Sequence, residues 1–397
     1  MEAIMQGRRA ILTGGASAGA LALAALGYRA WDRGVWSAGK GMAYAPWQDW
    51  EGTDADGIKR PLRAAILAAN PHDTQPWLFS VGDNAIAVFA DRSRNLGTFD
   101  PFRREMHLGI GAAIENLVLA ACVSGWTAEV TPVDGKFALS PPDTPIPVAQ
   151  ISLTSGPASC HALVRAIPIR HTNRGAYRVD QAVARPQLNR FAELVASDST
   201  RVVFVEDPQA RRELGAVIIE ATDRIVSDQQ MSADSARWFR TGRRDIAAHA
   251  DGVTADTSGL SPFMTAAAKV LPELSAQAAD TYWLSMTRDM HVATAPLLGI
   301  LLVRDRLDMR SAIDAGRAWQ RLHLAATLAG IAAQPLNQPV EWMDRCAMLG
   351  KPDSFGPTIT KFANAPGWEP TFVFRLGTAE RQANVSPRRA LAEVLKT

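Results

Sequence analysis

One short loop constrains this chain of 397 residues more than any other segment. Residues 70–77 read Asn-Pro-His-Asp-Thr-Gln-Pro-Trp, after an apolar helical run and before a strand-like run. Pro71 and Pro76 each fix a φ angle, so the loop is expected to be rigid. Its polar side chains can hydrogen-bond a polar ligand, and Trp77 can anchor it in the core. Asn, Pro and Asp also favour plain surface turns, so the loop alone leaves both interpretations open.

A second polar segment, Arg170-His171-Thr172-Asn173-Arg174, places two arginines four positions apart. Arginine offers a planar fork of donors that matches a phosphate group, and two arginines at this spacing can converge on one anion. The hydroxyl of Thr172 adds a neutral donor. A basic turn exposed to solvent would have the same composition, so the segment gains meaning only in combination with the loop.

Together the two segments resemble motifs of the FMN-dependent nitroreductase family. In that family a loop ending in Gln-Pro-Trp lies against the flavin ring and its ribityl chain, and an Arg-x-Ser-x-Arg element holds the phosphate, with Thr172 here in place of Ser. The resemblance implies FMN contacts for residues of both segments: Asn70, His72, Asp73, Gln75, Trp77, Arg170, Thr172 and Arg174. It also places Pro335 and Leu336 beside the ring and Arg375 near the phosphate. Family loops usually carry a neutral Asn where this chain has Asp73, and a carboxylate there could repel a reduced, anionic flavin.

The resemblance is closest to the Acg-type branch of the family and has consequences for the fold. In the family the loop and the arginines come from different subunits, whereas this chain carries both. The resemblance therefore implies an α+β fold, with an antiparallel-rich sheet flanked by helices and duplicated within one chain as a pseudo-dimer. Residues 114–121 and 318–326 are weak copies of one core-helix motif, which favours the duplication. Only one pairing of loop and arginines is complete, so we expect one FMN, bound by a monomer or a homodimer.

Four regions are expected along the chain. Residues 1–29 form an export signal or membrane anchor, residues 30–57 a linker, residues 58–155 the first half, and residues 156–397 the second half with a lid-like insertion at 237–300. Apolar periodicity predicts long helices at His107–Val123, Glu213–Val226 and Ala315–Gly330. Short apolar or alternating runs predict strands at Leu78–Val81, Ile86–Phe89, Thr127–Val133, Ala149–Leu153, Val202–Val205 and Thr371–Leu376.

The N-terminal sequence is typical of an export signal. Arg8-Arg9 precedes a run of 19 uncharged residues, 10–28. A basic pair before an apolar run is the pattern of a signal peptide, and it resembles the twin-arginine signal in particular. The run approaches the roughly 20 residues that span a bilayer. We therefore expect the protein in the periplasm, or attached to the inner membrane through residues 10–28; a soluble N-terminal helix is the alternative.

Composition and spacing argue against several other functions. The formal net charge is +2 and basic residues alternate with acidic ones, which argues against nucleic-acid binding. Cys122, Cys160 and Cys346 are widely spaced and form neither a metal motif nor a disulfide framework. The seven histidines lack metal-ligand spacing, so no metal is expected. Residues 15–19 match the hydrolase nucleophile pattern, but they lie in the apolar N-terminal run rather than between a strand and a helix.

The resemblance implies an oxidoreductase that passes a hydride from NAD(P)H through FMN to a small-molecule acceptor such as a nitroaromatic or a quinone. The flavin carries the hydride at N5, so no side chain is expected to act as a catalytic acid or base. If the insertion at 237–300 covers the flavin, the protein would bind and sequester FMN without turnover. A cofactor-free structural or stress protein is the third hypothesis.

Overall fold

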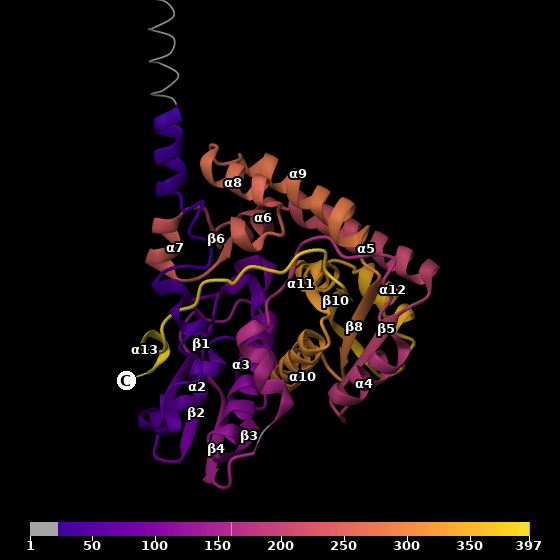
Figure 1. The fold of residues 1–397 in the computed structure, drawn as a ribbon. Coiled ribbons are helices and arrows are strands. Elements are labelled where there is room, and N and C mark those ends of the chain that lie inside the picture. Colours follow the sequence, from indigo (N-terminus) through magenta and orange to yellow (C-terminus); the bar gives the residue numbers. More distant parts are fainter. Residues whose placement is uncertain (1–22, 160, 397) are drawn as a thin grey trace, which may run out of the picture.

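The computed structural model describes residues 23–159 and 161–396, which form two antiparallel sheets with two long helices between them (Figure 1). This arrangement confirms the predicted α+β class. The expected export segment falls mostly on residues 1–22, which lie outside the described residues, as does Cys160. Residues 23–32 are helical and largely exposed.

The first sheet has the strand order β1-β2-β4-β3, and all its neighbours are antiparallel. Its strands are β1 (Trp77–Val81), β2 (Ala85–Ala90), β3 (Trp126–Pro132) and β4 (Ile146–Ser155). Five short helices precede or connect these strands: η1 (Met42–Trp47), η2 (Asp54–Lys59), α2 (Arg60–Ala65), η3 (Pro71–Asp73) and η4 (Gly97–Phe99). The long helix α3 (Arg104–Val123) follows the second strand, and η5 (Ala162–Ile169) follows the last.

The second sheet repeats this topology. Its order is β5-β8-β10-β9, again antiparallel throughout, with strands β5 (Thr200–Val205), β8 (Leu297–Val303), β9 (Ala332–Pro335) and β10 (Glu369–Gly377). In both sheets the order is first, second, fourth, third, and a 20-residue helix connects the second strand to the third; here that helix is α10 (Met309–Leu328). An internal duplication would produce this repetition, and the duplication remains our proposal.

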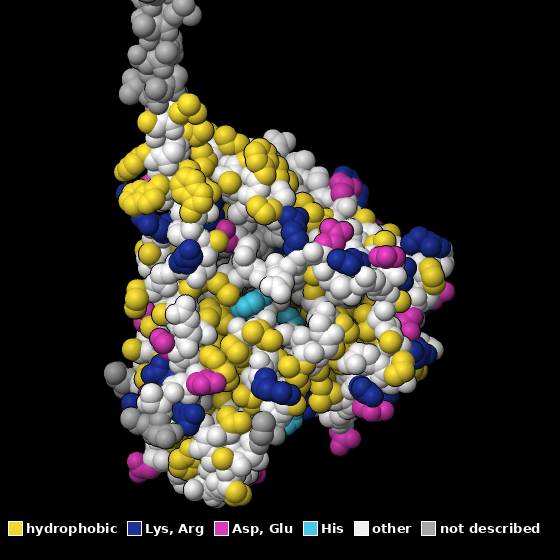
Figure 2. Space-filling model, viewed as in Figure 1, with side chains coloured by type: hydrophobic (Ala, Val, Ile, Leu, Met, Phe, Trp, Pro, Cys, Tyr) yellow, Lys and Arg dark blue, Asp and Glu magenta, His cyan; other side chains and the backbone are white. Residues whose placement is uncertain are grey.

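The remaining elements surround the second sheet and extend over the first half. They are α4 (Arg185–Val195), α5 (Pro208–Ser227), α6 (Gln229–Ala236), α7 (Arg243–His249), η6 (Ala255–Thr257), α8 (Pro262–Val270), α9 (Ala276–Met286), the π-helix η7 (Thr287–Val292), α11 (Gln338–Leu349), α12 (Phe355–Ala363) and α13 (Leu391–Val394). The two short strands β6 (Phe239–Arg240) and β7 (Val253–Thr254) pair in parallel. Elements α7, α8 and α9 lie at the end of the molecule where the N-terminal helix emerges, and hydrophobic side chains gather on that surface (Figures 1 and 2).

The two halves meet where α3 crosses α10. A Cβ on Gly316 would overlap the carbonyl oxygen of Leu108, and a Cβ on Gly111 would overlap that of Ile313. Small residues at the crossing therefore let the two backbones touch. Beside it, the Gln320 amide donates to the side chain of Asn116 at 2.8 Å.

The C-terminal arm, residues 378–396, returns from the second sheet to the first half (Figure 1). It ends against β1, where the Lys396 N–H donates to the carbonyl of Phe79 at 2.7 Å and Leu395 forms a bridge with Phe79. The arm therefore ties the end of the chain to the strand that follows the Asn70–Trp77 loop.

Three segments have local structure that the sequence did not predict. Leu297–Val303, which overlaps the end of the expected insertion, is the buried strand β8; a continuous apolar run does not distinguish a buried strand from a helix. Gln334 and Pro335 belong to β9, which pairs with β10. The expected linker at 30–57 packs in part against the protein, because Trp47 belongs to the core of the first half.

Among the described residues, α3 is the one helix long and apolar enough to cross a membrane. Of its most apolar window, 83% is buried inside the protein. Its apolar character is therefore accounted for by its position between the two halves.

Candidate functional site

The Asn70–Trp77 loop has an uncommon backbone. His72, Asp73 and Gln75 have φ angles of 48°, 56° and 49°, in the left-handed region that side chains other than glycine seldom adopt. Such conformations cost free energy and persist where the surroundings impose them, often at functional sites. Here the side chain of Asn70 accepts a hydrogen bond from the Gln75 N–H at 2.7 Å, which closes the loop on itself.

Gln75 holds the loop from outside the pocket. Its amide donates to the carbonyl of Ala250 at 2.9 Å and accepts from the Arg389 N–H at 2.8 Å. One fully buried side chain thus connects the loop to the insertion and to the C-terminal arm. Trp77 is also fully buried and anchors the start of β1 in the core, as predicted.

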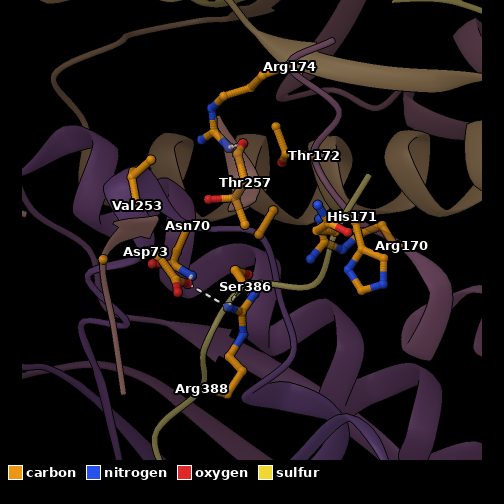
Figure 3. A pocket seen from close by; sticks show the side chains of 13 residues that line it. Asn70, Asp73, Arg170, His171, Thr172, Arg174, Val253, Thr257, Ser386 and Arg388 are labelled. Atoms are coloured by element: carbon orange, nitrogen blue, oxygen red, sulfur yellow. Dashed lines mark hydrogen bonds and ion pairs between the residues drawn. The ribbon is translucent and has the colours of Figure 1, made fainter. Parts of the chain in front are cut away.

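The loop and the arginine segment meet at one pocket (Figure 3). About 420 Å³ between its lining residues is not filled by protein atoms, and part of this space is open to solvent. Four separate parts of the chain line it: Ala69, Asn70 and Asp73; Arg170, His171, Thr172 and Arg174; Gly252, Val253 and Thr257; Asn384, Ser386 and Arg388. The pocket is therefore formed by both halves, the insertion and the arm together.

Three arginines and one carboxylate give the pocket its charge. Arg170 and Arg388 are almost completely buried, and Arg174 is partly buried. Burial and the neighbouring Arg388 lower the pKa of Arg170 to about 9, and burial also lowers the pKa of Arg174 and of Arg388. Guanidinium groups brought together out of water are stabilised by an anion, and Asp73 supplies one negative charge.

Asp73 and Arg388 form an ion pair of 2.6 Å between the loop and the arm. Burial raises the pKa of Asp73 to about 6 even though Arg388 opposes that shift. The expected repulsion between Asp73 and a reduced flavin is thus reduced, because a guanidinium already compensates the carboxylate.

Several polar atoms of this region make no hydrogen bond within the described part of the chain. They include Nε of Arg170, Nε of Arg388 and Oδ2 of Asp73. Buried polar atoms are nearly always satisfied in native proteins, so such atoms at a pocket indicate a polar ligand. Other donors of these arginines have protein partners: Arg170 donates to the carbonyl of Leu67 at 3.0 Å, and Arg174 to that of Thr257 at 3.1 Å.

The two histidines of the motifs have different positions. His171 lines the pocket and packs edge-on against Trp47, and burial, together with Arg170, lowers its pKa to about 3. His72 turns away from the pocket, with Nε2 2.9 Å from the hydroxyl of Ser235 and its ring against Phe99. His72 therefore supports the loop from behind.

The structure brings together five of the predicted cofactor residues as pocket lining: Asn70, Asp73, Arg170, Thr172 and Arg174. His72, Gln75 and Trp77 support the loop rather than line the pocket. Pro335, Leu336 and Arg375 do not line it. Leu336 is a core residue of the second sheet, and its N–H donates to the carbonyl of Val373 at 2.8 Å.

Protein groups occupy the guanidinium of Arg375. It donates to Gln334 at 2.7 Å, to the carbonyl of Gly175 at 2.6 Å and to the carbonyl of His291 at 3.0 Å, and it lies 3.8 Å from the ring centre of Tyr177. With these partners Arg375 stabilises the end of β10 beside the arginine segment.

Sequence reasoning missed the contributions of the C-terminal arm. Arg388 and Ser386 lie in a stretch without a motif, and only the return of the arm to the first half brings them to the pocket. The insertion was expected to cover the site, and Val253 and Thr257 do line the pocket. No group of three or more potential metal ligands occurs in the residues that the structure describes.

The names of proteins with similar sequences agree with the family that the two motifs resemble. No protein-family model matches the chain. The chain is 26% identical over 351 residues to the Mycobacterium tuberculosis protein named "Putative NAD(P)H nitroreductase Rv3131", an alignment that covers 86% of this chain and 92% of the relative. It is 30% identical over 166 residues to "Putative NAD(P)H nitroreductase acg" of the same organism, covering 41% of this chain and 47% of the relative.

Solved structures with a distant likeness carry related names. The FMN-dependent nitroreductase NfnB of Mycobacterium smegmatis, in complex with NADPH, covers 59% of this chain and 96% of its own at 19% identity and a TM-score of 0.38. A nitroreductase with bound FMN from Bacteroides fragilis covers 60% and 98% at 15% identity and a TM-score of 0.34. These TM-scores are too low to support an inference about the site. By its sequence the chain is similar over most of its length to one mycobacterial protein named as a putative NAD(P)H nitroreductase, and over 41% of its length to the Acg protein, which carries the same description.

Proposed function

We propose that this protein is an FMN-dependent NAD(P)H oxidoreductase of the nitroreductase type and that the pocket between Asn70 and Arg174 holds one FMN. One observation carries the proposal: two motifs about a hundred positions apart, each ambiguous alone, line the same pocket. The names of the relatives support the same reaction type.

The charge of the pocket fits the phosphate of FMN. With Asp73 ionised and His171 neutral, the lining residues carry an excess of two positive charges, from three arginines and one carboxylate. A phosphate monoester carries about −1.5 to −2 at neutral pH. Arg170, Arg174 and Arg388 would hold this group, with the hydroxyl of Thr172 as a further donor. The side chain of Asn70, which also lines the pocket, would contact the less charged part of the cofactor.

When bound, FMN would supply the hydride-transfer chemistry, and the protein would position it and tune its surroundings. The pocket residues fit this role of positioning the cofactor without supplying an acid or a base. His171, with its pKa lowered to about 3, remains neutral at physiological pH and is a poor proton donor there. The loop is held by Gln75 and by Arg388, so Asn70 and Asp73 are fixed before any ligand arrives.

The acceptor is proposed to be a small electrophile such as a nitroaromatic or a quinone, with NADH or NADPH as the donor. One feature favours a second candidate, an FMN-sequestering protein without turnover. The insertion lines the pocket with Val253 and Thr257, and the arm lines it with Ser386 and Arg388, so two separate segments could restrict the approach of NAD(P)H.

An absorption spectrum tests both candidates. Full-length protein is purified from cells supplied with FMN, and NADPH or NADH is then added without oxygen. Flavin bands that bleach within seconds would support the reductase, and bands that persist would support sequestration. A colourless protein that gains no FMN in a titration would overturn both proposals.

A further inference from the structure

The outer face of α8 and the residues that follow it are apolar and exposed. Phe263 is 80% exposed, Leu274 62%, Leu271 59% and Met264 47%. Soluble monomers seldom expose contiguous apolar patches of this kind unless the patch contacts another molecule. Figure 2 shows hydrophobic side chains gathered at this end of the molecule.

The single charged residue of α8 points into the protein. Lys269 is buried, forms a 2.7 Å ion pair with Asp256 and donates to the carbonyl of Gly34 at 3.0 Å. A surface helix normally exposes its charges and buries its apolar side chains. In α8 the reverse holds, since the lysine is inside while Phe263 and Met264 face outward.

The N-terminal helix, residues 23–32, continues this apolar surface. The Arg29 guanidinium donates to the carbonyl of Val270, which joins the helix to the end of α8. Trp31 is 54% exposed and Trp36 66% exposed. The sequence before this helix, residues 10–22, is uncharged. In sequence, the helix at 23–32 contains the end of the segment expected to enter a membrane, residues 10–28.

Basic residues flank the apolar surface. Arg29 reaches the end of α8, Arg33 lies beside Gly242 just before α7, and Arg244 pairs with Asp32 at 2.8 Å. Arg243 lies over the ring of Trp31 at 4.9 Å. Apolar and aromatic side chains bordered by arginine and lysine are the pattern of surfaces that lie at the interface of an anionic bilayer.

We propose that α8, residues 271–274 and the outer side of the helix at 23–32 form one lipid-contact surface. This surface seats the folded protein on an anionic bilayer, in addition to any attachment through residues 10–28. The proposal is independent of the flavin, because none of these residues lines the pocket.

A fluorescent label can measure the contact directly. The full-length chain, with its three cysteines replaced by serine, receives a single cysteine in place of Phe263 and is labelled with nitrobenzoxadiazole. It is then reconstituted in phosphatidylglycerol and phosphatidylethanolamine vesicles. The matched control is Val179→Cys, an apolar residue that is 62% exposed outside the proposed surface.

In vesicles that contain a lipid-borne doxyl quencher, we expect the label at position 263 to lose at least twice as much fluorescence as the label at 179. Anchoring through residues 10–28 alone would leave both labels in water. Equal quenching at the two positions, or none at either, would overturn the proposal.

A second variant tests whether the label itself, rather than the protein surface, brings position 263 to the lipid. Leu271→Glu combined with Leu274→Glu changes two exposed side chains, so the melting temperature should stay within a few degrees of the parent. We expect this change to reduce quenching at position 263 to the level of the control. Undiminished quenching in a folded double variant would contradict the lipid contact.

Discussion

The carboxylate of Asp73 accepts a hydrogen bond from the guanidinium of Arg388 at 2.6 Å, although 315 positions separate the two residues. Arg388 also donates to the carbonyl of Ala68 at 3.1 Å, just before the loop. The C-terminal arm thus fixes the loop and adds a buried cation to the pocket. A buried ion pair depends on both partners, because either charge alone would be costly out of water.

Arg388→Ala is expected to lower the free energy of unfolding by about 3–5 kcal/mol, since Asp73 would keep its burial and lose its counter-ion. The shift of the urea midpoint at pH 7.5 measures this change. Arg381→Ala, at an exposed position of the same arm, should cost no more than about 0.5 kcal/mol. Adding Asp73→Asn to Arg388→Ala should recover part of the loss, and equal losses at positions 388 and 381 would contradict the buried pair.

Arg174→Ala should weaken FMN binding roughly 10–100-fold, the loss expected for about 1.5–3 kcal/mol of charged hydrogen bonding. A titration of FMN fluorescence at low ionic strength gives the dissociation constant. Arg178→Ala is the matched control, because Arg178 is exposed and lies outside the pocket. Unchanged affinity in the Arg174 variant would remove this residue from the proposed phosphate site.

The contributions of Glu105 and Glu341 to stability should fall as pH rises from about 4.5 to 7, against the opposite contribution of buried histidines with a lowered pKa such as His171. Burial raises the pKa of Glu105 to about 7, with Arg104 opposing the shift, and burial raises the pKa of Glu341 well above its usual value, with the Glu105 charge adding to it. A carboxyl group with a raised pKa binds its proton more tightly in the folded state, so its contribution is lost as it ionises. Each such group contributes at most about 1.4 kcal/mol per pH unit.

Relative to the parent, the urea midpoint of Glu341→Gln should therefore increase as pH rises from 5 to 8, because the variant lacks the carboxyl group that ionises at a cost. The same change at Glu129, an exposed residue of β3, should leave the difference from the parent independent of pH. Parallel curves for the parent and the Glu341 variant would show that Glu341 does not take up a proton in this range.

Gly316→Ala should destabilise the protein by about 2 kcal/mol or more, because the new methyl group would overlap the backbone of Leu108 and force α3 and α10 apart. In a helix without that neighbour the same change would stabilise by up to about 1 kcal/mol. Gly27→Ala is the control, since a Cβ there meets no atom within 4 Å. Melting temperatures of the full-length variants compare the two, and equal shifts would rule out the close crossing.

The sequence predicted those pocket residues that lie within the two short motifs, residues 70–77 and 170–174. Prolines fix the loop around Asp73, and the spacing of Arg170 and Arg174 suits an anion, so both segments could be found without coordinates. The sequence could not show which side chains of the loop face the ligand. His72 points toward Ser235 and Gln75 toward Ala250, because residues distant in the sequence supply their partners.

Local pattern determined the long helices, most strands and the two polar segments, since periodicity, proline and charge spacing act over a few residues, and the resemblance of the two segments to a known family implied the α+β class. Tertiary structure alone decided that β8 is a central strand, that Arg375 is occupied by protein carbonyls, and that Arg388 reaches the pocket. These outcomes depend on contacts between residues tens to hundreds of positions apart. When such residues are buried together, each polar group must find its partner among them, and local preference does not decide which partner that is.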